Sequence, residues 1–271
     1  MKTLLAIKLS AIVVVLGLAR ETAFAAAAAS DTAANYVGTW STTPANLGSG
    51  FGAWANQALN NNSPPYVGTY LDQTSYGNSG SVLSAGYSWG TYANGSPGNG
   101  EFILSRPFTV GTDGTANLNN QSFSIGIGSG GIGGAGSSLT LNIGSAFSLG
   151  YVGGGSDNMT LSVDGAAGSV VPVTFANLNA GLLVNLAVSG ALNSTSEGYM
   201  LTITPFFGGA ALYTASGTFD SSAYNTSSFS VADLNTSANA YVNNPTVTPE
   251  PSSLFLGLSG LLTLLVVRRR K

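Results

Sequence analysis

Short runs of alternating apolar and polar residues recur along the middle of the chain. They are Ser122–Ile127, Leu139–Ile143, Met159–Val163, Val171–Phe175, Leu183–Val188 and Met200–Thr204. Clusters rich in Gly, Asp, Asn and Ser separate them, for example Gly128–Gly136 and Asn193–Ser196. A period of two places alternate side chains on the same face of a strand, and such clusters are typical of turns. The pattern therefore predicts antiparallel strands, each with one buried face.

One all-β domain accounts for this region. Residues 26–242 are enough for a single domain with one hydrophobic core. No repeat of fixed period and no long helical pattern interrupts them, and Phe229 and Val231 mark a further strand. Two antiparallel sheets packed face to face bury one-sided strands efficiently. We therefore predict an antiparallel β-sandwich of the jelly-roll kind over 26–242, followed by a linker over 243–251.

The first 25 residues have the three parts of a secretory signal peptide. The start is basic, with Lys2 and Lys8. An apolar stretch follows over Leu9–Ala19, and small residues end the segment at Ala23 and Ala25. An apolar stretch of this length is too short to span a bilayer. We expect export through the secretion machinery, with Ala23 and Ala25 defining the site for signal peptidase. The alternative is an uncleaved anchor, because Arg20 and Glu21 interrupt the pattern.

The C-terminal end has a second three-part pattern, which we expect to include a transmembrane helix. Pro249, Glu250 and Pro251 precede an apolar run over Leu254–Val267, and the chain closes on Arg268, Arg269, Arg270 and Lys271. A helix over the uncharged residues 252–267 would be about 24 Å long, which nearly spans a bilayer. The basic cluster should remain cytoplasmic, leaving the preceding domain outside.

This tail resembles the PEP-CTERM sorting signal of exported proteins from Gram-negative bacteria that make exopolysaccharide. Pro249, Glu250 and Pro251 match the recognition motif, and Arg268–Arg270 match its basic end. The resemblance implies processing by an exosortase, transient anchoring in the inner membrane and delivery to the cell surface or matrix. The alternative is an ordinary single-span anchor.

The middle of the chain loosely resembles the ectodomains of PEP-CTERM proteins. The resemblance is carried by Arg106–Phe108, Ser122–Ile127, Tyr199–Thr204 and Ser216–Phe219. It implies a concanavalin-like lectin sandwich, and it assigns no ligand.

Composition excludes several classes of function. The chain has no Cys and no His, which excludes a Cys/His zinc site, a Ser-His-Asp triad and disulfides. Only 7% of residues are charged, and nine acids, one base and no Lys lie between residues 31 and 247. Nucleic-acid binding needs clustered Lys and Arg to neutralise phosphates, so we expect no nucleic-acid partner.

Aromatic residues gather before position 95. The three Trp residues are Trp40, Trp54 and Trp89, and Tyr87, Tyr92 and Asn94 lie next to the last of them. Aromatic faces stack on sugar rings and amides bind hydroxyls, so Tyr87, Trp89, Tyr92 and Asn94 form a candidate glycan patch. Large aromatic side chains are more often part of a core. Tyr87 and Trp89 are two positions apart, so on a strand their side chains lie on the same face. We favour the interpretation that this face belongs to the core.

The charged residues offer little other chemistry. Arg106 is expected to be a structural clamp that pairs with an acid or loop carbonyls, rather than an anion site. Asp113–Asn119 has oxygen-bearing side chains at alternate positions, as in calcium loops, but a hairpin turn explains it better. The acids are scattered singly, with Glu101 beside Phe102 the best candidate for a cleft. We expect no cofactor, no metal and no enzymatic activity.

These observations favour an exported, non-enzymatic surface or matrix protein associated with exopolysaccharide. A lectin-like carbohydrate-binding module is the alternative, and a glycosidase is a third. The lack of Lys and the few other charges leave sheet edges with little electrostatic protection. We therefore also expect concentration-dependent self-association through those edges.

Overall fold

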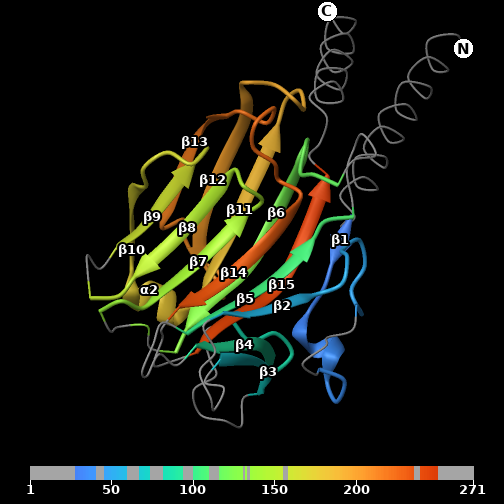
Figure 1. Ribbon diagram of the computed structural model, residues 1–271, viewed down its shortest axis with the longest axis vertical. Coiled ribbons are helices and arrows are strands. Elements are labelled where there is room, and N and C mark those ends of the chain that lie inside the picture. The colour runs from blue at the N-terminus through green and yellow to red at the C-terminus, as the bar shows by residue number, and fades with distance from the viewer. Residues whose placement is uncertain are drawn as a thin grey trace, which may run out of the picture.

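The computed structural model describes residues 28–40, 46–59, 67–73, 82–93, 100–109, 116–130, 132, 135–154, 158–234 and 239–249. Two antiparallel sheets lie face to face in this part of the chain, which confirms the predicted all-β sandwich (Figure 1). No helix among these residues is long and apolar enough to cross a membrane. The predicted signal helix and tail helix lie outside the described residues.

The first sheet has the strand order β13-β12-β11-β6-β15-β4-β3, and β1 pairs with β15 beside this path. Its strands are β1 (Ala29–Ser30), β3 (Val67–Gln73), β4 (Tyr87–Ala93), β6 (Gln121–Ser129), β11 (Leu182–Ser189), β12 (Glu197–Pro205), β13 (Tyr213–Phe219) and β15 (Ala240–Pro249). β11, β12 and β13 follow one another as antiparallel neighbours, whereas β15 inserts between β6 and β4.

The second sheet has the strand order β10-β9-β8-β7-β14-β5-β2. Its strands are β2 (Ala55–Leu59), β5 (Glu101–Pro107), β7 (Ser138–Ile143), β8 (Phe147–Val152), β9 (Asn158–Val163), β10 (Ser169–Thr174) and β14 (Ser228–Leu234). Asp164 and Gly165, both at positive φ, form the turn from β9 to β10. The short helix α2 (Phe175–Ala180) follows β10, and Thr174 caps it by accepting a hydrogen bond from the backbone N–H of Asn177.

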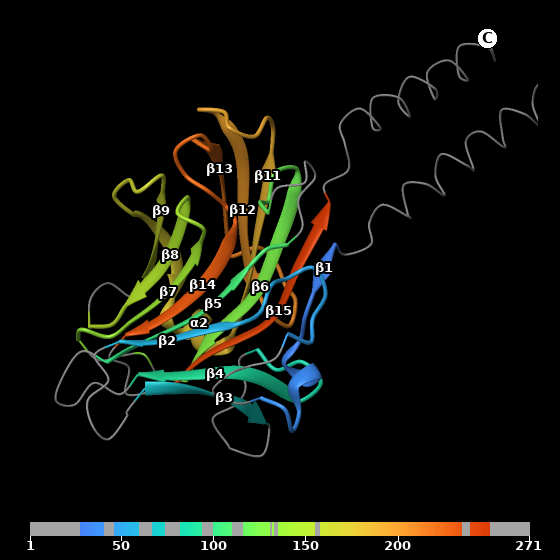
Figure 2. The same cartoon turned by 45° about the vertical axis from the view of Figure 1, so that its right-hand side comes forward.

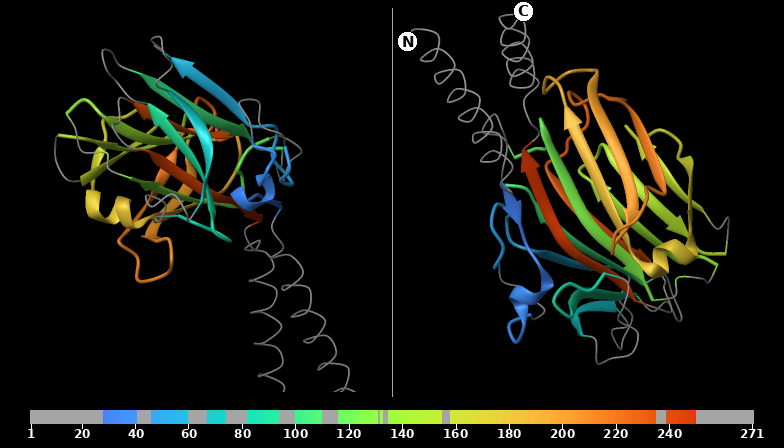
Figure 3. Two further views of the ribbon diagram at one scale, coloured as in Figure 1. Left: turned by 90° about the horizontal axis from the view of Figure 1, so that it is seen from below. Right: turned by 180° about the vertical axis from the view of Figure 1, so that it is seen from behind.

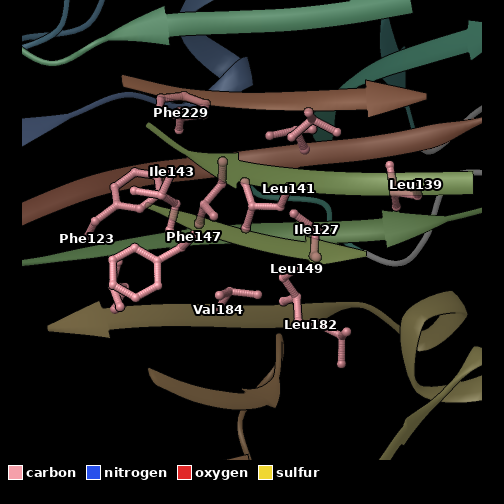
Figure 4. Close-up of a cluster of buried hydrophobic side chains, with 14 of the residues drawn as sticks. Phe123, Ile127, Leu139, Leu141, Ile143, Phe147, Leu149, Leu182, Val184 and Phe229 are labelled. Carbon is pink, nitrogen blue, oxygen red and sulfur yellow. The ribbon is translucent and has the colours of Figure 1, made fainter. Parts of the chain in front are cut away.

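The core lies between the two sheets and follows the predicted alternation. Figure 4 shows Phe123 and Val184 of the first sheet facing Leu141 and Phe147 of the second. These side chains are less than 5% exposed. Burying one such side chain contributes roughly 1.5–3 kcal/mol relative to leaving it in water. The alternating strands therefore supply the main driving force for the fold.

An N-terminal segment closes one side of the sandwich. β1 pairs with β15, and the 3₁₀ helix η1 (Ala33–Tyr36) that follows it contacts β4 (Figures 1 and 2). Tyr36 is fully buried and contacts Trp40 and Trp89 edge-on, with ring centroids 5.3 and 5.5 Å away. This segment thus completes the core at a place where the sheets alone would leave it open.

The predicted linker is wrong over residues 243–249, because these residues form most of β15. They pair with β6 up to Pro249↔Gln121, and with β1 through Thr246↔Ser30 and Val247↔Ala29. The register shifts between Asn243 and Thr246, so the inward-facing parity changes along the strand. The folded domain therefore extends to the first residue of the Pro-Glu-Pro motif.

Candidate functional site

The predicted glycan patch does not form one surface. Trp89 is fully buried and lies 4.8 Å from the ring of Trp54, so it belongs to the core. Tyr87 is partly buried and packs against the same core, as its shared parity predicted. Tyr92 has the opposite parity, so it lies on the other face of β4, where it is partly buried. Asn94 lies outside the described residues.

Tyr92 instead pairs with Tyr70, which the sequence analysis missed. β3 and β4 each contain Gly-Thr-Tyr, and the antiparallel register sets Gly68 opposite Tyr92 and Tyr70 opposite Gly90. The rings lie over the glycines: a Cβ on Gly68 or Gly90 would come within 2.6 or 2.4 Å of the facing ring. The repeated tripeptide is visible in the sequence, but the register of β3 with β4 is what brings these two rings together.

We call Tyr70 and Tyr92 the tyrosine pair. Their ring centroids are 6.2 Å apart and tilted by 44°. The core-facing residues of the same tripeptides, Thr69 and Thr91, point the other way, and Thr69 Oγ1 donates to the carbonyl of Gly90 at 2.8 Å. Any larger residue at the glycines would displace the rings, so the backbone itself fixes the pair.

The environment of Tyr70 keeps its hydroxyl protonated. Burial raises the pKa of Tyr70, and a hydrogen bond with Tyr241 and the negative charge of Asp72 raise it further. Tyr241 is almost fully buried and pairs with Gly90 from β15 on the same face of the sheet. A neutral phenol can donate and accept hydrogen bonds, while its ring offers an apolar face. The tyrosine pair can therefore stack on an apolar ligand surface and bind hydroxyls beside it.

Arg106 forms a buried clamp, as predicted. Its Nη1 pairs with Asp31 Oδ2, its Nη2 donates to Asn46 Oδ1, and its Nε donates to the carbonyl of Gly52 at 2.7 Å. Its guanidinium lies 4.8 Å from the ring centroid of Phe51. Arg106 and Asp31 side chains have no exposed surface. The guanidinium thus ties β5 to the N-terminal segment and presents no anion site.

Asp31 organises the residues that follow it. Its Oδ2 accepts a 2.6 Å hydrogen bond from the hydroxyl of Tyr36, and its Oδ1 accepts from the backbone N–H of Thr32 at 2.8 Å. Burial and this hydrogen bond to Asp31 raise the pKa of Tyr36. The single base of the domain, one acid and one phenol therefore form a satisfied buried network.

The remaining described acids do not gather into one site, although Asp164 and Asp220 are neighbours. Asp233 lies in the core and accepts a 3.1 Å hydrogen bond from Thr91 Oγ1 in the facing sheet. Asp164 accepts from the backbone N–H of Asp220 at 2.8 Å. Glu101 begins β5, with Phe102 next to it in the core. Among the described residues, no group of three or more Asp or Glu side chains is placed to hold a metal ion.

The segment considered for calcium has the conformation of a turn where it is described. Leu118 is fully buried, and its carbonyl accepts from the backbone N–H of Gln121 at 2.9 Å. Asn120 has a φ of 53°, a left-handed conformation that Asn tolerates. Asn117–Gln121 is therefore a turn, but the predicted hairpin is wrong, because the strands before and after the segment, β5 and β6, belong to different sheets. Asp113 lies outside the described residues.

The sorting residues lie almost entirely beyond the described chain. Pro249 ends β15 and is partly buried. Ala23, Ala25, Glu250, Pro251 and Arg268–Arg270 lie outside the described residues, so their assignments stay predictions.

No protein-family model matches this chain, and no curated protein matches it. Among solved structures, it is similar to a botulinum neurotoxin DC binding domain (12% identity, TM-score 0.38), covering 77% of this chain and 51% of that one. It is also similar to a Bauhinia forficata lectin in complex with GalNAc, at 9% identity and a TM-score of 0.37, over 72% of this chain and 98% of the lectin. A third similar structure is the VIP36 exoplasmic/lumenal domain with Ca²⁺ and Man3GlcNAc, at 8% identity and a TM-score of 0.42, over 68% of this chain and 88% of that one. The chain spans about half the length of the neurotoxin domains. At these scores and identities the similarities say nothing about what this chain binds.

Proposed function

We propose that this chain is an exported, non-enzymatic surface protein, anchored by its C-terminal tail and then processed for delivery to an exopolysaccharide-rich envelope. The tail pattern of Pro249–Pro251, Leu254–Val267 and Arg268–Arg270 supports the sorting step. The β-sandwich is the part that the tail delivers.

The pairing of β1 with β15 is the observation that carries this proposal. Ala29 lies opposite Val247, and the backbone N–H of Ala28 donates to the carbonyl of Val247 at 2.8 Å. The start of β1 and the end of β15 therefore leave the sandwich at the same end, while β3 and β4 lie at the other end (Figures 1 and 3). A domain held by either terminus would turn that end toward the membrane and present the β3–β4 end outward.

The test compares cell fractions of the full chain in a bacterium that makes an exosortase. We expect the wild-type protein to reach the surface without residues 254–271. Replacing Arg268–Arg270 by Gln should hold the unprocessed protein in the membrane fraction. The control replaces Ser252 and Ser253 by Ala, which preserves the uncharged run and should be processed normally. Equal processing of the wild-type protein and the Arg-to-Gln variant would contradict the sorting role of the basic end.

Carbohydrate binding at the tyrosine pair is the second candidate function. The observation that favours it is the seating of Tyr70 and Tyr92 on Gly90 and Gly68, which holds two rings against the sheet. Asp72 lies two residues along the same face of β3 from Tyr70. Rings fixed in place lose little side-chain entropy on binding, and Tyr combines an apolar face with a hydroxyl.

A glycan array probed with the exported protein tests this candidate. Tyr92→Ala should abolish a positive signal, whereas Tyr92→Phe should retain most of it, because the ring is kept. Tyr224→Ala, at a partly buried tyrosine outside β3 and β4, is the control. A signal unchanged by Tyr92→Ala, or no signal for the wild-type protein, would refute carbohydrate binding at the tyrosine pair.

A further inference from the structure

Apart from the two-residue β1, four described strands lie at sheet edges, and they differ in how they are protected. β10 contains Pro172, which lacks an N–H, and its register with β9 shifts between Val171 and Thr174. β3 carries the charge of Asp72, and β2 is only five residues long. Proline, charge, irregular register and short length all discourage another strand from adding to an edge. Three edges therefore carry at least one such feature.

β13 carries none of them. It runs over seven residues without a charge or proline, and it pairs with β12 in one continuous register from Glu197↔Phe219 to Ile203↔Tyr213. Thr214, Ser216 and Thr218 are exposed. Among the described strands, β13 forms ladder hydrogen bonds with β12 alone. One side of its backbone therefore has no strand partner among the described residues, although β10 of the other sheet lies in contact with β13.

Core contacts hold β13 in an extended conformation that is ready to pair. Phe219 is buried, and its ring centroid lies 5.0 Å from that of Phe147. A large apolar side chain lies exposed beside the strand: Met200, on β12, pairs with Ser216. A rigid, uncharged edge flanked by apolar surface favours strand addition.

We propose that β13 pairs antiparallel with β13 of a second copy of this chain. Full overlap of the two strands centres a two-fold axis on Ser216, which sets Ser216 opposite its own copy and Thr214 opposite Thr218 of that copy. Such a contact is isologous, because each chain offers the same surface. One strand pair buries little area, so the association should be weak and depend on concentration.

The symmetry of this contact has a consequence that rests on the proposed function. β13 runs in the same sense as β15, because four antiparallel steps separate them in the sheet. Antiparallel pairing of two β13 strands therefore turns the tethered ends of the two copies in opposite directions. Copies anchored side by side in one membrane cannot meet this way, so removal of the tail would permit assembly.

Cysteine cross-linking tests the contact, since the chain has no Cys. Directly opposed residues in antiparallel strands have Cβ atoms about 4.5–5.5 Å apart, within reach of a disulfide after small adjustment. Under mild oxidation, the full-length Ser216→Cys chain in detergent should form dimers on a non-reducing gel. Ser169→Cys, an exposed serine on β10, is the matched control and should remain monomeric. Equal dimer yields, or no dimer from Ser216→Cys, would overturn the β13 contact.

Charge reversal tests the register. The double variant Thr214→Lys/Thr218→Lys puts Lys opposite Lys of the second copy and should weaken the association roughly tenfold. The double variant Thr214→Lys/Thr218→Glu puts Lys opposite Glu instead, and it should associate as well as the wild-type protein. Equal affinities in sedimentation velocity would contradict the register. The tether is tested separately: Ser216→Cys should cross-link in the released protein but not in intact membranes. If Ser216→Cys cross-links in detergent and also gives equal dimer yields in intact membranes and after release from them, the β13 contact stands. The claim that membrane anchoring prevents it is then wrong.

Discussion

Removing the negative charge of Asp31 should strongly destabilise the sandwich. Asp31→Asn keeps the size of the side chain but leaves the guanidinium of Arg106 buried without its counter-charge. Breaking a buried ion pair by removing one partner typically costs about 3–5 kcal/mol. Arg106 keeps its hydrogen bonds to Asn46 and Gly52, so we expect about 3 kcal/mol. For a domain of this size, that lowers Tm by about 6–12 °C.

The double variant Asp31→Asn/Arg106→Met gives the sharper result. It leaves neither charge in the core, and replacing both members of a buried pair is often far less costly than removing one. The double variant should therefore lose at least about 1 kcal/mol less than the sum of the single variants. Urea denaturation followed by Trp fluorescence measures all three proteins, because Trp40, Trp54 and Trp89 lie together in the core cluster.

The control is Glu101→Gln, at a partly buried acid that begins β5, the strand that also contains Arg106. We expect it to change stability by less than about 0.5 kcal/mol, as most substitutions away from buried networks do. If Asp31→Asn cost no more than this control, or if the single effects were additive, the buried charge pair would not be the clamp that closes the sandwich.

Three further predictions concern other parts of the domain. Asn243→Ala should lower the free energy of unfolding by about 2–4 kcal/mol, measured by urea denaturation. The buried amide donates to the carbonyls of Val82 and Tyr87 at 2.9 and 2.6 Å and accepts from the backbone N–H of Ala33 at 3.1 Å. A loss of stability smaller than that of Asn239→Ala would contradict this. The raised pKa of Tyr36 stabilises the fold below about pH 10, and this stabilisation should fall above that pH by up to about 1.4 kcal/mol per pH unit as the phenol of the unfolded chain ionises. In urea denaturation at a series of pH values, Tyr36→Phe should make the loss of stability above about pH 10 less steep. An unchanged slope would count against this prediction. Trypsin should leave residues 31–247 nearly whole even in urea, because Arg106 is their only basic residue and precedes a proline; extensive fragments on a gel would disprove it.

The sequence predicts those strands whose pattern stays regular. β6, β7 and β9 alternate between apolar and small or polar residues, so one face could be assigned to the core from the residues alone. The pattern does not predict β15, because its register shifts between Asn243 and Thr246. The positions in the hydrophobic core are even-numbered before the shift, as at Val242, and odd-numbered after it, as at Val247, so the alternation is broken. Its Asn and Pro residues then look like a linker, although tertiary pairing on both sides makes them a strand.

The candidate site could be predicted only in part. Parity placed Trp89 and Tyr87 on one face, and the structure confirms that this face is the core. The same parity puts Tyr92 on the opposite face, so a patch that joins all three residues could not form on one regular strand. The partnership of Tyr70 with Tyr92 depends on the register of β3 with β4, which only the folded chain defines.

Intact-mass analysis of the protein recovered from the cell surface tests the central claim most directly. The account predicts a chain that begins at Ala26 and ends between Pro249 and Ser253, so that β1 and all of β15 remain while the apolar tail is gone. A mass that retains Leu254–Lys271 would contradict processing at the sorting motif. A chain that ends inside β15 would contradict the assignment of residues 243–249 to the folded domain.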